Sequence, residues 1–251
     1  MTDQTTTTTP GNTICGVNAT SEPAVDFTKA SVSPLITGRL NNHDPRFNVA
    51  SVHLQSADMF GPRVGFLKFE AALTDPSGRK LPGIVFARGG SVAVAAVLIC
   101  EGKAYTVLTV QPRFATGVFE FKETCAGMLD GSGNFAGVAA KELKEELDIE
   151  VAADDLTDLS SLAGFPGGIY MSPGGCDETI RFFAFTRQVT REEMDAMNGR
   201  CTGALDENEQ ITLQIVPLED LLTYPDAKTL LAYSLFQRFK DKVPGAEAIK
   251  S

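Results

Sequence analysis

The chain has 251 residues, of which 43% are hydrophobic, so it can bury a sizeable core as one large domain or as one domain with a smaller annex. Its formal net charge of −10 argues against a nucleic-acid backbone or an anionic membrane surface as the partner, because both attract clustered lysine and arginine. The five cysteines include no C-x-x-C pair and the histidines number two, so we expect free thiols in a reducing compartment, the cytoplasm, with neither a zinc site nor a histidine-based triad.

The first part of the chain divides into a tail and an annex. Residues 1–22 open with a polar threonine run that lacks a basic or apolar segment, so we expect a disordered tail rather than a signal or transit peptide. Residues 23–87 alternate short apolar segments with turn signals such as Asp75-Pro76-Ser77-Gly78. This alternation predicts a small N-terminal β-rich domain.

Residues 88–251 interleave strands and helices. The run VAVAAVLIC at residues 92–100 is far shorter than the ~20 apolar residues of a membrane helix and predicts the first strand of a central hairpin. Further segments predict strands at residues 118–123, 180–185 and 211–216 and helices at residues 191–197 and 226–240. Strands and helices in this order predict an α/β sandwich with a mixed sheet.

The stretch AGMLDGSGNFAGVAAKELKEELDI, residues 126–149, ends in a cluster of charges. On a helix, Glu142, Glu145 and Glu146 fall within an arc of roughly 100° and share one face. Like charges four residues apart destabilise a helix by about 0.2–0.5 kcal/mol, and a bound Mg²⁺ or Mn²⁺ reverses that effect. The alternative is a solvated helix on which Lys141 and Lys144 pair with the glutamates.

With its glycines and acids spaced out, this stretch resembles the Nudix box, G-x5-E-x7-R-E-U-x-E-E-x-G-U, where U is aliphatic. The first glycine is Gly127, and the E-U-x-E-E core is present in full. The stretch departs from the box at Gly133 in place of Glu, Lys141 in place of Arg and Asp148 in place of Gly. The resemblance implies a Nudix-type α/β/α sandwich in which the glutamates of the core carry divalent metal ions.

Three further segments are similar to motifs of one Nudix subfamily, the ADP-ribose and ADP-sugar pyrophosphatases. They are SPGGCDE at residues 172–178, DENE at residues 206–209 and QPR at residues 111–113. The amino-acid sequences of these motifs are most similar to those of plant-type ADP-sugar diphosphatases. The resemblance implies hydrolysis of the diphosphate link of an ADP-sugar, such as ADP-ribose or ADP-glucose, to AMP and a sugar phosphate.

The resemblance also implies a role for each matching residue. Residues that hold Mg²⁺, or alternatively Mn²⁺, are Ala126 through its carbonyl, Glu142, Glu145, Glu146 and Glu209. The catalytic residues are Glu207 as first choice of general base, Glu178 as the reserve, and Glu145. Residues expected to bind substrate are Arg113 as a clamp on the diphosphate, Gly127, Pro173 and Phe165, whose ring is either a loop anchor or a stacking platform for the base.

Three functions stay open on these grounds. The first is an ADP-sugar hydrolase, the second a UDP-sugar hydrolase of the same family, and the third a nucleotide-binding module that has lost catalysis through its departures from the box. The resemblance further implies that the β-rich domain builds a homodimer and completes the adenosine pocket. No nucleic-acid or membrane partner is expected.

Overall fold

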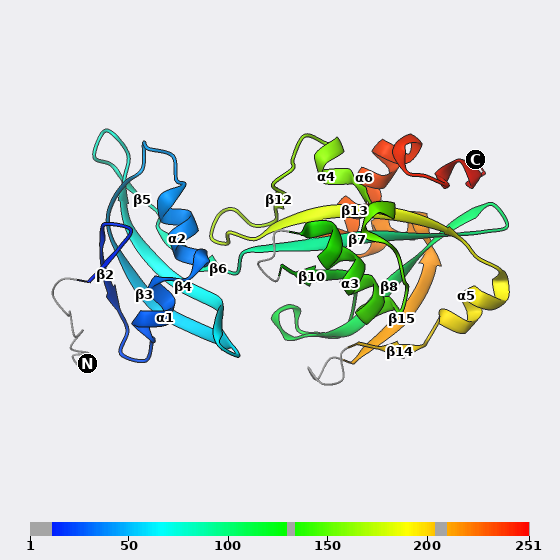
Figure 1. The fold of residues 1–251 in the computed structure, drawn as a ribbon, viewed down its shortest axis with the longest axis horizontal. Helices are drawn as coiled ribbons and strands as arrows, with labels where there is room; N and C mark the ends of the chain where they lie inside the picture. Colours follow the sequence, from blue (N-terminus) through cyan, green and yellow to red (C-terminus); the bar gives the residue numbers. More distant parts are fainter. Residues whose placement is uncertain (1–11, 130–133, 204–209, 251) are drawn as a thin grey trace. The chain divides into compact units, whose positions relative to one another are not determined.

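The computed structural model describes residues 12–129, 134–203 and 210–250 (Figure 1). The chain folds into two compact units. The first comprises the described residues up to Gly89 together with Ser172–Glu178, and the second comprises the remainder. In the described part of the chain, no helix has both the length and the hydrophobicity needed to cross a lipid bilayer.

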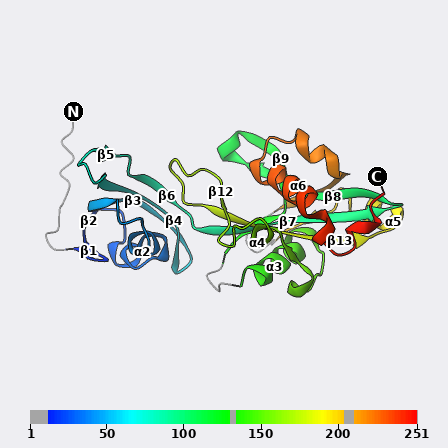
Figure 2. The same ribbon diagram turned by 90° about the horizontal axis from the view of Figure 1, so that it is seen from above.

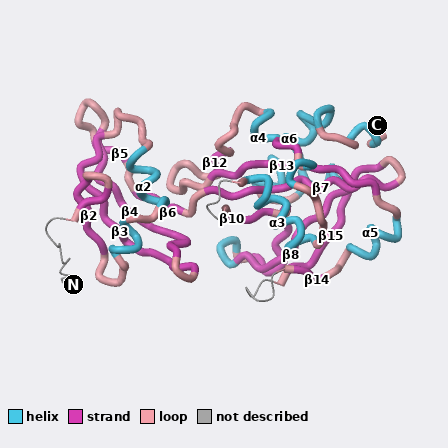
Figure 3. The backbone as a smooth tube through the Cα atoms, viewed as in Figure 1, coloured by secondary structure: helices cyan, strands magenta, loops and turns pink. Residues whose placement is uncertain are grey.

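The first unit is β-rich, as predicted, and is built on one six-stranded sheet with two helices (Figure 3). The strand order is β1-β2-β3-β4-β5, β6 pairs with β4, and only β2 and β3 run parallel. Its elements are β1 (Thr13–Ile14), β2 (Val17–Ser21), α1 (Phe27–Ser31), α2 (Pro34–Asn41), β3 (Asn48–Phe60), β4 (Arg63–Thr74), β5 (Lys80–Leu81) and β6 (Ile84–Ala87).

The predicted disordered tail is wrong for residues 12–22. Ile14 and Ala19 are 2% and 4% exposed, and both belong to the core of the first unit. β2 adds to the sheet by pairing in parallel with β3. The sequence did not predict β2, because its burial depends on pairing with β3, a strand some thirty residues away.

The second unit is an α/β/α sandwich with a mixed sheet, which confirms the predicted fold class. The sheet order is β11-β13-β7-β8-β15-β14, with β10 on β7, β12 on β13 and β9 on β8; β13 and β7 are parallel. Its strands are β7 (Gly90–Cys100), β8 (Lys103–Arg113), β9 (Val118–Thr124), β10 (Ala126–Met128), β11 (Thr157–Asp158), β12 (Ile169–Tyr170), β13 (Thr179–Gln188), β14 (Cys201–Thr202) and β15 (Ile211–Pro217).

Helices cover both faces of this sheet. The α-helices are α3 (Phe135–Leu147), α4 (Leu159–Leu162), α5 (Arg191–Met197) and α6 (Ala227–Phe239). Short 3₁₀ helices lie at Phe114–Thr116, Ala153–Asp155, Leu218–Thr223, Lys240–Lys242 and Ala246–Ala248. Figure 2 shows α3 and α6 on opposite sides of β7.

Alternation along β7 explains the two layers. Val92, Val94 and their even-numbered neighbours pack in one core with α3, whereas Ala93, Ala95 and their odd-numbered neighbours pack in another with α6. A strand covered on both faces reads as a continuous apolar run rather than an alternating one. The run at residues 92–100 therefore forms the centre of the sheet and holds α3 in a fixed orientation.

Candidate functional site

The helix of the box, α3, is bounded by local capping interactions. The Asn134 side chain accepts a hydrogen bond from the Gly137 amide at 3.0 Å, which caps the N-terminus. At the other end Asp148 adopts the left-handed conformation with φ 52°, and the Ile149 amide donates to the Leu143 carbonyl at 3.0 Å. These contacts form a C-terminal capping motif that usually takes glycine.

This capping motif accounts for the departure at Asp148 from the glycine of the box. Aspartate is one of the few residues that tolerate a positive φ. Its carboxylate also accepts hydrogen bonds from Lys144 at 2.6 Å and from Arg200 at 2.7 Å, and these contacts lower the pKa of Asp148. The substitution therefore preserves the end of the helix.

Strand β10 brings the start of the box against the glutamates of α3. A Cβ built on Gly127 would lie 1.8 Å from both Cδ and Oε1 of Glu142. The Glu142 carboxylate therefore rests directly on the backbone of β10, at a position that only glycine leaves open. The Ala126 amide donates a hydrogen bond to Oε2 of Glu146 at 3.2 Å.

Glu146 is a buried carboxyl group, 5% exposed. Its burial, together with the nearby charges of Glu142 and Glu123, raises its pKa to about 8, although hydrogen bonds from Cys125 and Ala126 oppose the shift. A buried carboxylate beside a second, partly buried one favours either a proton or a cation. The pair formed by Glu142 and Glu146 therefore fits a divalent metal ion, with the Ala126 backbone as a neighbour.

Glu145 lies differently from the other two glutamates of the core. Its side chain is 39% exposed, and its carboxylate forms an ion pair with Lys141 at 3.3 Å. The solvated-helix alternative thus describes Glu145, whereas Glu142 and Glu146 turn toward β10. Within residues 12–129, 134–203 and 210–250, no three His, Cys, Asp or Glu side chains gather closely enough to hold a metal ion.

Two glutamates predicted for the site, Glu207 and Glu209, lie outside the described residues, as does the departure at Gly133. The chain just before the DENE segment is fixed to α3. Thr202 donates its hydroxyl to the Glu146 carbonyl, and the Gly203 amide donates to the Glu145 carbonyl at 3.2 Å. Thr202 also pairs with Ile211, so the described residues on either side of the DENE segment are neighbours in the sheet.

Arg113, predicted as the diphosphate clamp, contacts a residue that the sequence analysis missed. Its Nε donates to Oε1 of Glu123 at 2.5 Å, and Lys228 of α6 donates to Oε2 of the same carboxylate. Glu123 is 3% exposed, whereas the Arg113 side chain is 43% exposed. The sequence did contain an indication of Glu123. Alternation along a strand places its side chain on the same side as Cys125, directly before the box.

The remaining predicted residues are divided between the two units. Phe165, in the second unit, is 54% exposed, so its ring is not a buried loop anchor. Pro173 and Glu178 belong to the first unit, where the Glu178 carboxylate lies 3.4 Å from Arg88. The SPGGCDE segment is part of that unit because the Phe86 amide donates to the Gly175 carbonyl at 2.8 Å.

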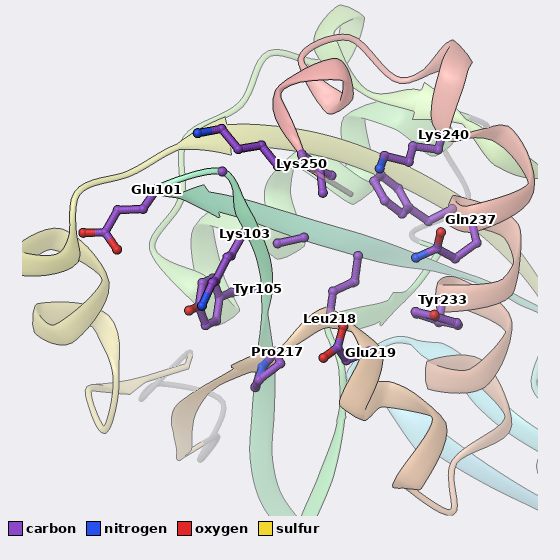
Figure 4. Close-up of a pocket in the computed structure, with 14 residues that line it drawn as sticks. Glu101, Lys103, Tyr105, Pro217, Leu218, Glu219, Tyr233, Gln237, Lys240 and Lys250 are labelled. Atoms are coloured by element: carbon purple, nitrogen blue, oxygen red, sulfur yellow. The ribbon is translucent and has the colours of Figure 1, made fainter.

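A cavity of about 540 Å³ lies elsewhere in the second unit (Figure 4). It is bordered by the turn between β7 and β8, the end of β15, α6 and the C-terminal segment, and includes Lys103, Tyr233 and Lys240. Of the predicted site residues that the structure describes, none lines it. Lys103 begins β8 and Arg113 ends it, about 30 Å apart at the rise of a strand, so this cavity is separate from the box.

An α/β/α sandwich that lays a glutamate-bearing helix against a glycine of a short strand defines a Nudix-type domain. A family model described as NUDIX domain matches residues 90–239. Nudix hydrolase 14, chloroplastic, of Arabidopsis thaliana is 39% identical over 225 residues, which cover 84% of this chain and 72% of that protein. The chain therefore belongs to the Nudix family of hydrolases, as predicted.

A solved structure shares the fold. The crystal structure of an ADP compounds hydrolase superposes with a TM-score of 0.55 at 17% sequence identity, covering 80% of this chain and 98% of that one. At this identity the match supports the architecture alone. The substrate must be argued from the site.

Proposed function

We propose that the protein catalyses the Mg²⁺-dependent hydrolysis of the diphosphate link of ADP-sugars to AMP and a sugar phosphate. The observation that carries this proposal is the pair of carboxylates, Glu142 and Glu146, held against Ala126 and Gly127 by the fold of the box. The names of the Arabidopsis relative, a Nudix hydrolase, and of the ADP compounds hydrolase support the same class of reaction.

The residues of the box would hold the metal ion. Glu142, Glu145, Glu146 and the Ala126 carbonyl would provide its oxygen ligands, and Glu209 would join from the later loop. Bound magnesium screens the charge of the diphosphate and lowers the pKa of a coordinated water. Manganese has the same preference for oxygen ligands and would substitute for it.

The other predicted residues act on the substrate and on the attacking water. Arg113 would clamp the diphosphate with the free end of its guanidinium group. Glu207 would accept a proton as the water oxygen bonds to one phosphorus and the bond from that phosphorus to the bridging oxygen breaks. Glu178 is the reserve base, and the exposed ring of Phe165 is available to stack on the nucleobase.

The β-rich unit would build a homodimer. Pro173, in its SPGGCDE segment, would bind substrate. The predicted location is the cytoplasm; the name of the Arabidopsis relative places that protein in the chloroplast.

An AMP-release screen tests the proposal. ADP-ribose, ADP-glucose and UDP-glucose are incubated at equal concentration with Mg²⁺, with Mn²⁺ or with a chelator, and the nucleoside monophosphate is quantified by chromatography. We expect AMP from the ADP-sugars only when metal is present, and a loss of more than about 100-fold in the Glu146→Gln variant. Faster release of UMP would favour the UDP-sugar hydrolase, and tight binding without release would favour the non-catalytic module.

A further inference from the structure

Glu123 is a buried carboxylate that contacts two cations. It lies on β9 and is 3% exposed. Oε1 accepts from Nε of Arg113 at 2.5 Å, and Oε2 accepts from Nζ of Lys228. Because both oxygens are engaged, the carboxylate is held in one orientation.

Lys228 occupies a position that helix stability does not explain. It lies in the first turn of α6, where the helix dipole disfavours a positive charge. Asp226, which caps this helix through the Thr229 amide at 3.1 Å, lies 3.2 Å from the ammonium group. The Thr229 hydroxyl in turn accepts from the Thr124 amide at 2.9 Å. The start of α6 is thereby fixed to β9, and Lys228 fixes Glu123.

The opposite partner, Arg113, is held by only one side of its guanidinium group. Its Nε is committed to Glu123. Among the residues that the structure describes, the Arg113 side chain makes no other hydrogen bond or ion pair. Nη1 and Nη2 form the fork that binds phosphate oxygens, and this end of the half-exposed side chain is available.

The ion pairs of Glu123 with Arg113 and Lys228 form a network that lies beside the box. Glu123 precedes Ala126 by three residues, and its charge raises the pKa of both Glu146 and Cys125. The buried ion pairs of Glu123 and the carboxylates of the box therefore belong to one electrostatic neighbourhood.

We propose that Glu123 is a positioning residue: locked by Lys228, it aims the fork of Arg113 at the diphosphate. The inference rests on the proposed function, because it takes a diphosphate as the group that Arg113 binds. A purely structural ion pair would stabilise the fold without affecting affinity, so affinity and stability must be measured together.

The experiment measures binding rather than turnover, by calorimetry with α,β-methylene-ADP, a diphosphate that cannot be hydrolysed, in the presence of Mg²⁺. The full chain, Glu123→Gln, Arg113→Ala and the double variant form a cycle. We expect Glu123→Gln to weaken binding at least about tenfold in the wild-type background and less than about twofold when Arg113 is already alanine. Equal effects in the two backgrounds, unchanged affinity, or no binding by the wild type would overturn the proposal.

Two further variants separate positioning from folding. Glu123→Gln leaves the buried Lys228 short of a partner and is expected to lower stability. Glu123→Gln combined with Lys228→Met removes the charge that has lost its Glu123 partner, and this variant must still show the loss of affinity. Asp158→Asn breaks the part-buried ion pair of Asp158 with Arg181 in the same unit and is expected to lower stability with unchanged affinity.

The proposed function and this inference fail separately. A wild type that binds the analogue but releases no AMP from any ADP-sugar refutes the hydrolase and leaves the positioning role standing. A wild type that releases AMP while Glu123→Gln binds the analogue as tightly refutes the positioning role alone.

Discussion

Gly127→Ala is expected to separate activity from stability, because the three closest contacts of the added Cβ all fall on the side chain of Glu142, a proposed metal ligand. The added Cβ would lie 1.8 Å from Cδ of Glu142. Non-bonded carbon atoms rest about 3.5 Å apart, so the carboxylate must retreat by about 1.7 Å. A misplacement of about 1 Å in a catalytic group can cost 10²-fold in rate. We therefore expect AMP release from ADP-ribose to fall at least about 100-fold.

Stability should respond differently to the same substitution. Glu142 is long and flexible, so its retreat costs little, and Gly127 does not occupy the left-handed region of backbone space. Alanine inside a strand is favoured over glycine by roughly 0.5–1 kcal/mol. Thermal unfolding should therefore show a free energy of unfolding within about 1 kcal/mol of the wild type.

The matched control is Gly38→Ala in α2, where a Cβ meets nothing within 4 Å. This variant should keep full activity. Full activity in Gly127→Ala as well would refute the placement of the Glu142 carboxylate against β10. Unfolding of Gly127→Ala would refute the argument that the flexible side chain yields.

Three further predictions concern the helix end, the later loop and the oligomer. Asp148→Gly should change the free energy of unfolding by less than about 1 kcal/mol. Asp148→Val should lower it by about 2 kcal/mol, because a β-branched residue resists a positive φ. Chemical denaturation measures both changes. Glu207→Gln should reduce kcat by about 10²–10⁴-fold with little change in Mg²⁺ dependence, and Glu209→Gln should raise the Mg²⁺ concentration for half activity; losses of only a few-fold in both would move the base elsewhere. Light scattering of the full chain should show a dimer and deletion of residues 23–87 a monomer of little activity, and a full-length monomer at micromolar concentration would contradict this.

Local patterns predicted the elements whose causes are local. The continuous apolar run at residues 92–100 identified the central strand, because both of its faces are covered. The helix at residues 191–197 was predicted within its observed bounds, and the structure shows why: Thr190 and Glu193 form a reciprocal capping box. These features depend on residues no more than a few positions apart.

The helical arc of the glutamates was a weaker guide. It put Glu142, Glu145 and Glu146 on one face, yet their exposures differ because β10 covers only part of that face. Glu146 falls about 40° from Glu142 on one side, and Glu145 about 60° on the other. The helical periodicity does not indicate whether Glu145 or Glu146 faces the sheet.

Long-range contacts were beyond the sequence altogether. Glu123 and Lys228 are 105 residues apart, and no periodic pattern links them. Likewise the SPGGCDE segment was recognised as a motif, but its pairing of Cys176 with Phe86 in the first unit follows only from the folded chain. Charged residues are almost never buried unless they are paired, so a charged residue at a buried strand position, such as Glu123, indicates a long-range ion pair in similar sequences.

The most direct test of the central claim is to locate a bound metal ion. Mn²⁺ added to ¹⁵N-labelled full-length protein broadens the amide signals nearest to it. We expect the signals of Ala126 and Gly127 to disappear first, at Mn²⁺ concentrations that leave them visible in Glu146→Gln. Broadening centred elsewhere in the chain, or equal broadening in that variant, would contradict a metal site formed by Glu142 and Glu146 against β10.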